Sequence, residues 1–468
     1  MAGSLQKLYA HEQNELASEL ALLWESSRDW ARSAECFNRA AQHANSLFAY
    51  RESLELAQHG LALLNKQPEN QDRAMLELQL QGTLGAPLLA TKGYAAAEVG
   101  LVQQRVYELS KILGDRELLI RSTRQLHSYY LILGDVSKSL EQAEVFVSEA
   151  ERSGEKHAMI EAYNCRALSL CHLARVPECF QDFEKLLSLC DVETAAEQEK
   201  FVALNPRVLA ITTMGWLRWF LGEVETAVDQ QHAAMVLCDA PRSQSNETPT
   251  FSKIHTLFVS CLVHQHRRDT ADVARLSQLV IDYSTVQGNA FYREMGTICQ
   301  GWALSEQGDL SNGLRQIEIG HQACLALGSR VCEPHILSMK AECFGRVNQI
   351  DEAIATIAVA LQSSIATGQL LYEADLFRLQ GELLSRIGSD NTLAEAEVCF
   401  RKALQVARSR KFRSLELRAA TSFCRHLRGT ASETVARQQL AEVHGWFTEG
   451  TATLDWQDAN DLLQTQSA

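Results

Sequence analysis

The sequence predicts an all-α protein built as a solenoid of helical hairpins. Two patterns predict it. A turn between two helical patterns recurs about every 39 to 46 residues, within the range of helical repeat arrays. Only 7 prolines interrupt 468 residues, and the stretches between them are rich in Ala, Leu, Glu, Gln and Arg, which lose least on entering a helix. We expect the turns at Gly93–Tyr94, Gly134–Asp135, Val176–Pro177, Gly222–Glu223, Arg268–Asp269, Gly308–Asp309, Asn348–Gln349, Asp390–Asn391 and Gly429–Thr430.

The arm before Gly134 shows the helical period clearly. Leu119, Thr123, Leu126 and Tyr130 step by four and three, which keeps one face apolar up to the glycine. Glycine can take the left-handed conformation that ends a helix, and the polar residues after it can cap the next one. Capping-box spacing occurs in Thr392 with Glu395 and in Thr430 with Glu433.

Small residues stand at fixed offsets from the turns. Gly301 lies seven residues before Gly308, and Gly313 lies five residues after it. The same offsets recur at Gly215 with Ala227 and at Ala341 with Ala353. Tetratricopeptide repeats (TPR) have small residues there because the two helix backbones approach closely. We therefore expect TPR-like hairpins that wind into a right-handed superhelix.

The whole chain, 1–468, is predicted to form one continuous array. Residues 1–80 carry less regular hairpins, 239–250 form a loop between units or a domain boundary because of Pro241 and Pro249, and 451–468 form a terminal capping helix. In the less regular part we expect a short hairpin around Asp29, from Trp24 to Phe37, and a helix over Tyr50–Leu64.

The net charge and the cysteines indicate which partners and which cellular compartment to expect. The net charge of -14 opposes binding to nucleic acid or to an anionic membrane, because both need a local excess of Lys and Arg. The 13 cysteines are scattered without a CxxC pair and are predicted to be small buried hydrophobes in a reducing compartment. The N-terminus has no apolar signal region and no stretch is long enough for a membrane span, so a cytoplasmic location is expected.

Several segments together resemble the C-terminal TPR-like (MalT-like) region of bacterial signalling proteins. In that family a STAND or AAA-type ATPase, often preceded by a class III adenylate/guanylate cyclase or a kinase, is followed by helical repeats. No GxxxxGK[ST] phosphate loop occurs here, so the resemblance implies the sensor region alone, without nucleotide hydrolysis or cyclase activity. The segments are LGAPLLATKGYAAAEV (84–99), GWALSEQG (301–308), EADLFRLQGELL (373–384), AEAEVCFRKALQVAR (394–408), SLELRAA (414–420) and GWFTEG (445–450).

One set of residues has metal-like spacing. His321 and Cys324, followed by Cys332 and His335, read as HxxC and CxxH. However, Leu314, Ile317, His321 and Cys324 step by three and four, which places the first pair on a buried helix seam and favours core packing. There is also no GxSxG elbow. We therefore expect no metal, no cofactor and no catalytic residue, with an enzyme whose active site lies unrecognised in the groove as an alternative.

Binding residues are expected on the first helix of each hairpin, which lines the concave face of a TPR array. Aromatic and Arg side chains are the usual anchors of such a surface. Trp216 and Trp302 could instead fill the space between hairpins, and Arg378 with Glu382 could be a solvated pair. Counting back from the turns, the candidates are Arg121, Arg124, Trp216, Trp219, Trp302, Glu342, Arg346, Arg378 and Glu382.

These patterns predict a non-catalytic sensor or scaffold module of a signalling system. A protein or peptide partner is expected, a small-molecule ligand is possible, and no nucleic acid or membrane partner is expected. The alternatives are a regulatory part of an ATPase, adenylate cyclase or transcription-activator system, and a self-assembling structural protein.

Overall fold

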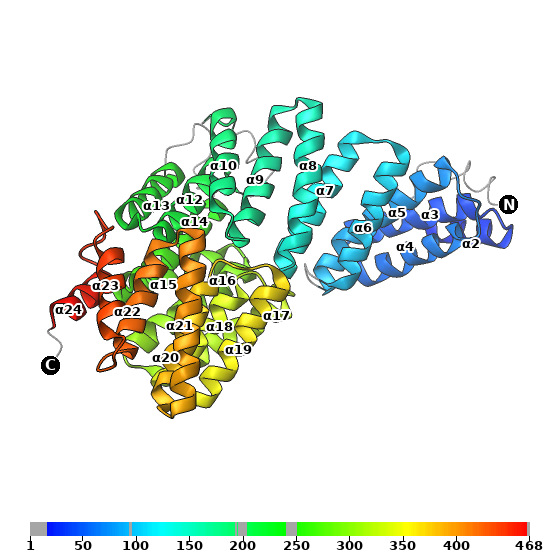
Figure 1. The fold of residues 1–468 in the computed structure, drawn as a ribbon. Coiled ribbons are helices and arrows are strands. Elements are labelled where there is room, and N and C mark those ends of the chain that lie inside the picture. The colour runs from blue at the N-terminus through cyan, green and yellow to red at the C-terminus, as the bar shows by residue number, and fades with distance from the viewer. Residues whose placement is uncertain (1–15, 93–95, 192–193, 195–203, 240–249, 466–468) are drawn as a thin grey trace. The chain divides into compact units, whose positions relative to one another are not determined.

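The computed structural model describes residues 16–92, 96–191, 194, 204–239 and 250–465. Within these ranges all regular secondary structure is helical, which confirms the predicted all-α fold (Figure 1). The chain divides into two compact units. The N-terminal unit comprises residues 1–133, 141–153 and 327–329, and the C-terminal unit comprises residues 134–140, 154–326 and 330–468.

From α2 to α7 the N-terminal unit is an up-and-down series of helices in which each helix packs on the next. Its core joins successive helices through side chains such as Phe37, Leu63, Leu80, Val99 and Tyr129. The predicted helix over residues 50–64 is confirmed with those bounds. The helices are α2 (Ala17–Ser26), α3 (Trp30–Ser46), α4 (Tyr50–Leu64), α5 (Gln71–Lys92), α6 (Ala97–Leu113), α7 (Arg116–Leu133) and the larger part of α8 (Val136–Ser153).

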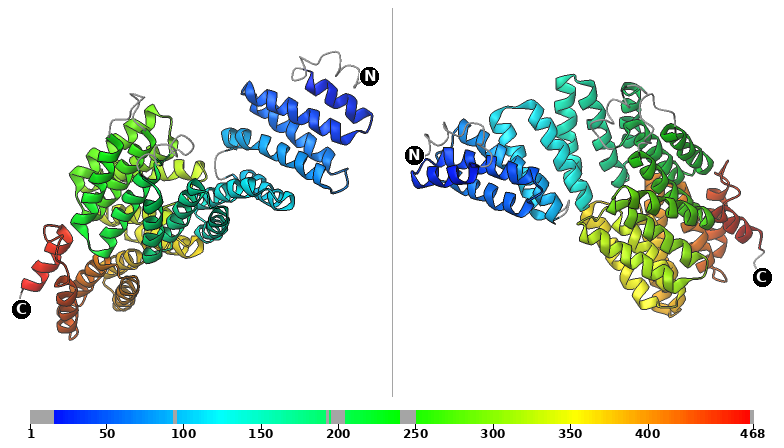
Figure 2. Two further views of the ribbon diagram at one scale, coloured as in Figure 1. Left: turned by 90° about the horizontal axis from the view of Figure 1, so that it is seen from above. Right: turned by 180° about the vertical axis from the view of Figure 1, so that it is seen from behind.

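The C-terminal unit continues as hairpins, and the views in Figure 2 show the same alternation of helix direction within it. The first helices of its hairpins are α9 (Lys156–His172), α12 (Pro206–Leu221), α14 (Thr250–Arg267), α16 (Ala290–Glu306), α18 (Glu333–Arg346), α20 (Glu373–Ile387) and α22 (Arg413–His426). The second helices are α10 (Val176–Leu189), α13 (Val224–Asp239), α15 (Thr270–Val286), α17 (Leu310–Ala326), α19 (Ile350–Thr367), α21 (Asp390–Arg410) and α23 (Glu433–His444), and α24 (Leu454–Gln464) follows.

Most of the predicted turns are confirmed. Helices end and begin around Gly134, Gly222, Gly308 and Gly429, all with positive φ, and Arg268 and Asn348 take the same left-handed conformation with φ of 64° and 62°. The predicted turn at Gly93 and nearly all of the predicted loop 239–250 lie outside the described residues.

Two turns were placed wrongly by two residues. Val176 begins α10 and the left-handed residue is Ala174, because Pro177 suits the first turn of a helix, where its missing N–H costs nothing. Likewise, Asp390 begins α21. Its cap is Ser389, whose hydroxyl accepts a hydrogen bond from the Thr392 backbone N–H, so the predicted pairing of Thr392 with Glu395 is wrong.

The close approach predicted within the hairpins is confirmed at α16 and α17. A Cβ added to Gly301 would lie 2.7 Å from the Gly313 carbonyl oxygen, and one added to Gly313 would lie 2.6 Å from that of Gly301. The equivalent Ala341 and Ala353 are fully buried. Small residues at these positions therefore set the distance between paired helices.

The hairpins of the C-terminal unit turn far enough for early and late helices to meet. The Ser414 hydroxyl on α22 donates to the Trp219 carbonyl on α12 at 2.5 Å. The Leu370 N–H before α20 donates to the His172 carbonyl at the end of α9 at 2.8 Å. These contacts bring α12 next to α22 and the end of α9 next to the start of α20, on the side where the first helices lie.

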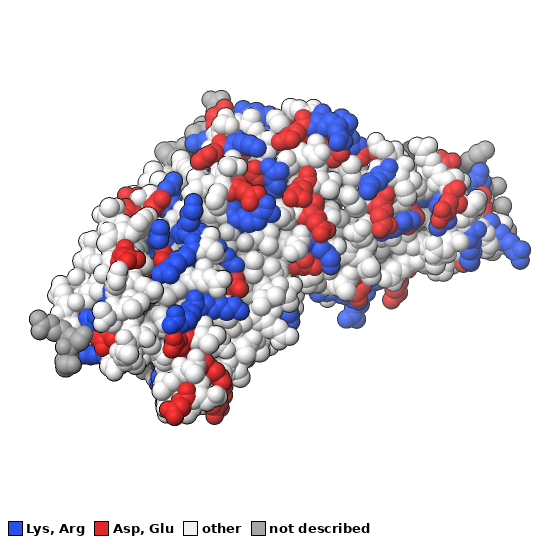
Figure 3. All heavy atoms as spheres, in the orientation of Figure 1, with Lys and Arg blue, Asp and Glu red and all other residues white. Residues whose placement is uncertain are grey.

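The 13 cysteines are free thiols, and all are buried except the partly buried Cys399, which confirms their predicted role as small hydrophobes. Across the described residues, none of the helices has an apolar stretch long enough to span a bilayer. On the face drawn in Figure 3, acidic and basic side chains of the described residues are interspersed.

Candidate ligand-binding cavity

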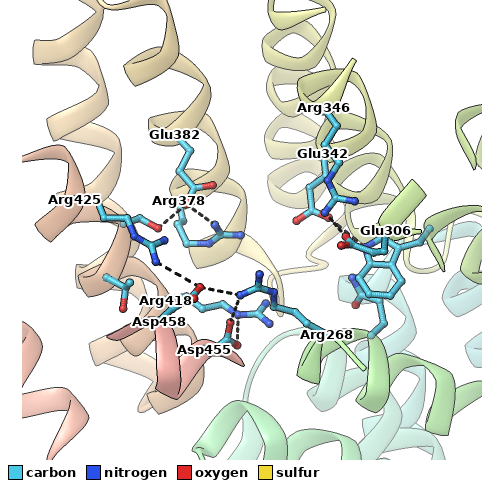
Figure 4. Close-up of a pocket in the computed structure, with 14 residues that line it drawn as sticks. Arg268, Glu306, Glu342, Arg346, Arg378, Glu382, Arg418, Arg425, Asp455 and Asp458 are labelled. Atoms are coloured by element: carbon cyan, nitrogen blue, oxygen red, sulfur yellow. Dashed lines mark hydrogen bonds and ion pairs between the residues drawn. The ribbon is translucent and has the colours of Figure 1, made fainter. Parts of the chain in front are cut away.

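The C-terminal unit contains a cavity of about 260 Å³ on the inner side of its first helices. Figure 4 shows that side chains from successive hairpins and from α24 converge on it. Five arginines and five acidic residues contribute to its wall. The lining residues are Gln265, Arg268, Trp302, Glu306, Glu342, Arg346, Arg378, Glu382, Arg418, Thr421, Ser422, Arg425, Asp455 and Asp458.

The wall follows the repeat of the chain. Trp302, Glu342, Glu382 and Ser422 lie 40 residues apart and occupy the same place on α16, α18, α20 and α22. Neighbours in this row bond to each other: the Trp302 indole N–H donates to Glu342 Oε2 at 3.3 Å, and the Ser422 hydroxyl donates to Glu382 Oε1 at 2.6 Å. One inward-facing position per hairpin therefore builds a ladder along the cavity.

Arg346 and Glu306 form an ion pair between α18 and α16, one helical turn further along. Arg346 Nη1 also lies 3.5 Å from the Ser305 hydroxyl. Arg346, Glu306 and Glu342 lie together on one side of the cavity in Figure 4.

Arg378 anchors the middle of the wall. Its Nε lies 2.6 Å from Asp375 Oδ1 and its Nη1 lies 2.9 Å from Glu382 Oε1, both on α20. Burial alone would raise the pKa of Asp375, but the neighbouring Arg378 and Arg418 hold that pKa below its ordinary value. Arg378 is thus a buried cation held between two carboxylates.

Helix α24 contributes two further acids. Arg418 Nε lies 2.6 Å from Asp455 Oδ2, and Arg268 Nη1 lies 2.9 Å from Asp458 Oδ2 and 3.5 Å from Asp455 Oδ1. Arg425 Nη2 lies 3.4 Å from Asp458 Oδ2. Because Arg268 directly follows α14 and the acids lie on the last helix, this network joins two distant parts of the unit around the cavity.

Glu342 differs from the other acids of the wall. None of the ion pairs between described residues includes it, and its hydrogen bond comes from the Trp302 indole. Burial raises its pKa to about 7, and the negative charge of Asp375 adds to that effect. Near neutral pH its carboxyl group is therefore poised between the protonated and ionised forms.

Beneath the cavity lies an aromatic cluster formed by Trp216, Trp219, His266, His335 and Tyr372. His266 stacks on Trp219 and His335 stacks on Tyr372, with ring centroids 4.6 and 4.1 Å apart. The Trp216 indole N–H points to His266 Nε2 at 3.3 Å. Burial lowers the pKa of His335 to about 3 and holds that of His266 well below its ordinary value.

Arg418 connects the two layers. Its guanidinium lies 4.9 Å above the Trp219 ring and also donates to the His266 carbonyl, while its Nε faces Asp455. The side chain that pairs with an acid in the cavity wall therefore rests directly on the aromatic cluster.

The predicted site residues fall into three groups. Trp302, Glu342, Arg346, Arg378 and Glu382 come together in the cavity wall. Trp216 and Trp219 do not line the cavity and pack in the aromatic cluster instead. The remaining two, Arg121 and Arg124, lie on α7 of the N-terminal unit, where Arg121 pairs with Glu117 at 2.8 Å.

Sequence reasoning did not select several wall residues. Glu306 and Arg418 could have been found by the 40-residue spacing, since they lie 40 residues from Arg346 and Arg378. Asp455 and Asp458 carried no such signal, because α24 follows the last hairpin and only the tertiary fold brings it to the cavity.

The residues with metal-like spacing do not meet around a common point. Cys324 Sγ contacts Met295 Sδ at 3.9 Å, His321 Nε2 lies 3.6 Å from Glu333, and His335 stacks on Tyr372. Among the residues the structure describes, no group of three or more His, Cys, Asp and Glu side chains is placed to hold a metal ion.

The sequence matches no protein-family model and no curated relative. A comparison with solved structures found several that are similar to it. A Rap protein complexed with Competence and Sporulation Factor has a TM-score of 0.54 and 10% identity, covering 81% of this chain and 99% of that chain. A STAND protein with a tetratricopeptide repeat sensor from Pyrococcus horikoshii has a TM-score of 0.40 and 12% identity, covering 81% of this chain and 54% of that chain. Yeast Tom70 has a TM-score of 0.34 and 12% identity, covering 97% and 96%. The chain has a TPR-like helical repeat fold.

Proposed function

We propose that this protein is a non-catalytic binding module of a signalling system, and that its ligand occupies the cavity of the C-terminal unit. The observation that carries the proposal is the convergence of five arginines and five acids from successive first helices and from α24 on one space. Charged side chains at the same place in successive repeats form a wall that can select a ligand by the arrangement of its charges.

The size and polarity of the cavity indicate what enters it. Ligand pockets commonly hold about 300 to 1,000 Å³ and are mostly apolar. At about 260 Å³ with a charged wall, this cavity suits a side chain of a peptide or a small polar molecule better than an apolar ligand. A peptide or protein segment that inserts one side chain is the favoured partner, and a free small molecule is the other candidate.

Two further arguments favour binding. A protein of the same fold, Rap, is found complexed with Competence and Sporulation Factor. In addition, the cavity wall joins α14 to α24 through Arg268 and Asp458. A ligand that competes for these side chains would change how the hairpins are held together, and a partner chain could sense that change. On this proposal the module regulates an ATPase, a cyclase or a transcription activator on another chain or another segment.

The test is a thermal-shift screen of peptide and metabolite libraries against two charge-reversed variants. Arg346→Glu with Arg425→Glu alters two partly exposed arginines of the wall. The matched control, Arg315→Glu with Arg401→Glu, makes the same change on α17 and α21, away from the cavity.

We expect a ligand that raises the melting temperature of the wild type and the control equally and that of the cavity variant by a different amount, because reversing two charges of the wall alters the affinity. A ligand that stabilises all three proteins equally would place binding elsewhere. Absence of any ligand in both libraries and in the purified native protein would oppose the proposal itself.

A further inference from the structure

We propose that Glu342 is the recognition site for a positively charged group of the ligand, an ammonium or a guanidinium. The inference rests on the proposed function and specifies the chemistry of the same cavity. It follows from the charge pairing around the wall, from the placement of Glu342, and from the groups that face it.

Every arginine of the wall already has a carboxylate partner. The five arginines pair with Glu306, Asp375, Glu382, Asp455 and Asp458. An anionic ligand would have to displace one of these carboxylates and leave it without a cation in a partly desolvated space, which is unfavourable. The arginines therefore do not define a vacant anion site.

Glu342 is a sixth acid, and it has no cationic partner among the described residues. It lines the cavity between Trp302 and Arg346, and its hydrogen bond comes from the neutral indole. Asp375 does not line the cavity but pairs with Arg378, so six acids in all face the arginines of the wall. When Glu342 is ionised, these six acids outnumber the five arginines by one negative charge. A ligand cation beside this carboxylate would restore neutrality and supply the ion pair that the chain does not.

The nearest charges do not remove this preference. Arg378 and Arg346 face Glu342 from α20 and α18, while Asp375 and Glu306 face it from α20 and α16. Each of these arginines is bonded to one of these acids. Their fields on Glu342 therefore largely cancel, and a cation is the ligand group that its carboxylate selects.

Binding of the cation should be linked to proton release. Burial and then Asp375 raise the pKa of Glu342 to about 7, so about half of the molecules hold this proton at pH 7. A cation stabilises the ionised form and expels the proton. Affinity should therefore rise with pH through 7 and level off above about pH 8.

The test uses four probes in isothermal titration calorimetry. Nα-acetyl-lysine-N-methylamide carries the ammonium, Nα-acetyl-norleucine-N-methylamide has the same chain without it, and Nα-acetyl-glutamate-N-methylamide carries a negative charge. n-Butylamine distinguishes a free amine from a lysine side chain of a peptide as the source of the cation. If n-butylamine binds as tightly as the lysine probe, the cavity recognises the ammonium group alone. If n-butylamine binds more weakly, the cavity also recognises the peptide groups.

We expect the lysine probe to bind about tenfold more tightly than the norleucine probe, as one ion pair in a partly desolvated site predicts. Titrations at pH 7 in phosphate and in MOPS, two buffers without a primary amine that differ in protonation enthalpy, should show release of about half a proton, because Glu342 has a pKa of about 7. Glu342→Gln should abolish both the preference and the proton release. Glu342→Asp keeps the charge and should keep the preference at lower affinity.

The control is Glu352→Gln, the same substitution at an exposed residue of the same hairpin, and it should behave as the wild type. Tighter binding of the glutamate probe, or equal binding of the lysine probe by Glu342→Gln, would overturn the inference. A library ligand that is lost in the Arg346→Glu, Arg425→Glu variant and retained by Glu342→Gln would leave the proposed function standing and refute only the role of Glu342.

Discussion

The same position of the first helix has opposite environments in two regions of the C-terminal unit. Six residues before the left-handed turn residue stand Trp216 on α12, Trp302 on α16, Glu342 on α18 and Glu382 on α20. Trp216 is enclosed by rings in the aromatic cluster, whereas Glu342 and Glu382 line an open cavity. The offset from the turn fixes that the side chain points inward, and the neighbouring helices decide what it meets.

The difference arises from where the array closes. Near α12 the late helices α20 and α22 pack across the concave side, and Tyr372 and Phe412 fill it with rings. Between α16, α18 and α24 the wall contains the ring of Trp302, and its other side chains are mainly charged and surround water-accessible space. Apolar residues at the inward position therefore support the closure, and charged residues at the same position are free to contact a ligand.

The sharpest test of this division is Trp219→Ala. Trp219 is 2% exposed and packs on Phe220, His266 and Arg418. Its removal should lower the free energy of unfolding by about 3 to 5 kcal/mol, as is usual for a large buried aromatic residue. Chemical denaturation of the variant would measure the loss. A loss below about 1 kcal/mol would mean that the aromatic cluster does not hold the closure together.

Asp455→Asn tests the cavity wall. The change leaves Arg418, whose side chain is 13% exposed, without its 2.6 Å partner. Unpairing a buried charge costs about 3 to 5 kcal/mol, and because this pair borders the cavity we expect about 2 kcal/mol. Glu397→Gln breaks the exposed Arg401–Glu397 pair, also at 2.6 Å, and should cost less than about 1 kcal/mol. Equal losses in the two variants would show that the wall is solvated like an outer surface.

Acid should weaken the aromatic cluster through His335. Its pKa is about 3 in the folded protein because burial disfavours the charged ring, whereas the unfolded ring titrates near 6.5. The unfolded state therefore binds more protons below pH 6.5, and this residue alone should cost about 2 kcal/mol of stability between pH 7 and pH 5.

His335→Phe keeps a ring against Tyr372 and removes the titration. Within the described residues His335 Nε2 has no hydrogen-bond partner. The Ser338 hydroxyl lies 3.4 Å from His335 Nδ1 and also donates to the His335 backbone carbonyl at 2.7 Å, a bond that the substitution keeps. Unfolding curves at pH 7 and pH 5 should lie closer together in this variant. An unchanged difference would assign the acid sensitivity to other buried histidines such as His266.

How far sequence reasoning reached can be seen from these residues. Hairpin turns were predictable because Gly222 and Gly308 end helices for local reasons. The inward offset was also predictable, which is why five candidates lie in the wall. The sequence did not predict that Trp216 is buried in the core while Glu342, at the same position of its helix, lines the cavity. That difference depends on contacts such as the one between Ser414 and Trp219, which are 195 residues apart. The place of Asp455 was not predictable either, because only the tertiary fold brings α24 to Arg418 and the cavity.

Glu342→Gln gives the smallest expected effect and the most specific one. The folded protein keeps the Glu342 proton up to a pKa of about 7, while the unfolded chain loses it near 4.3, so the wild type loses stability as pH rises from about 4 to 7. Glutamine keeps the shape and removes this dependence. Discounted for exposure to the cavity, the gain should be about 1 kcal/mol at pH 8 and near zero at pH 4. Glu352→Gln should show no such pH-dependent gain, because that side chain is exposed. An identical shift in melting temperature for Glu342→Gln at both pH values would mean that Glu342 is solvated and paired in the unliganded protein. It would then no longer be the one acid that the arginines of the wall leave without a cation.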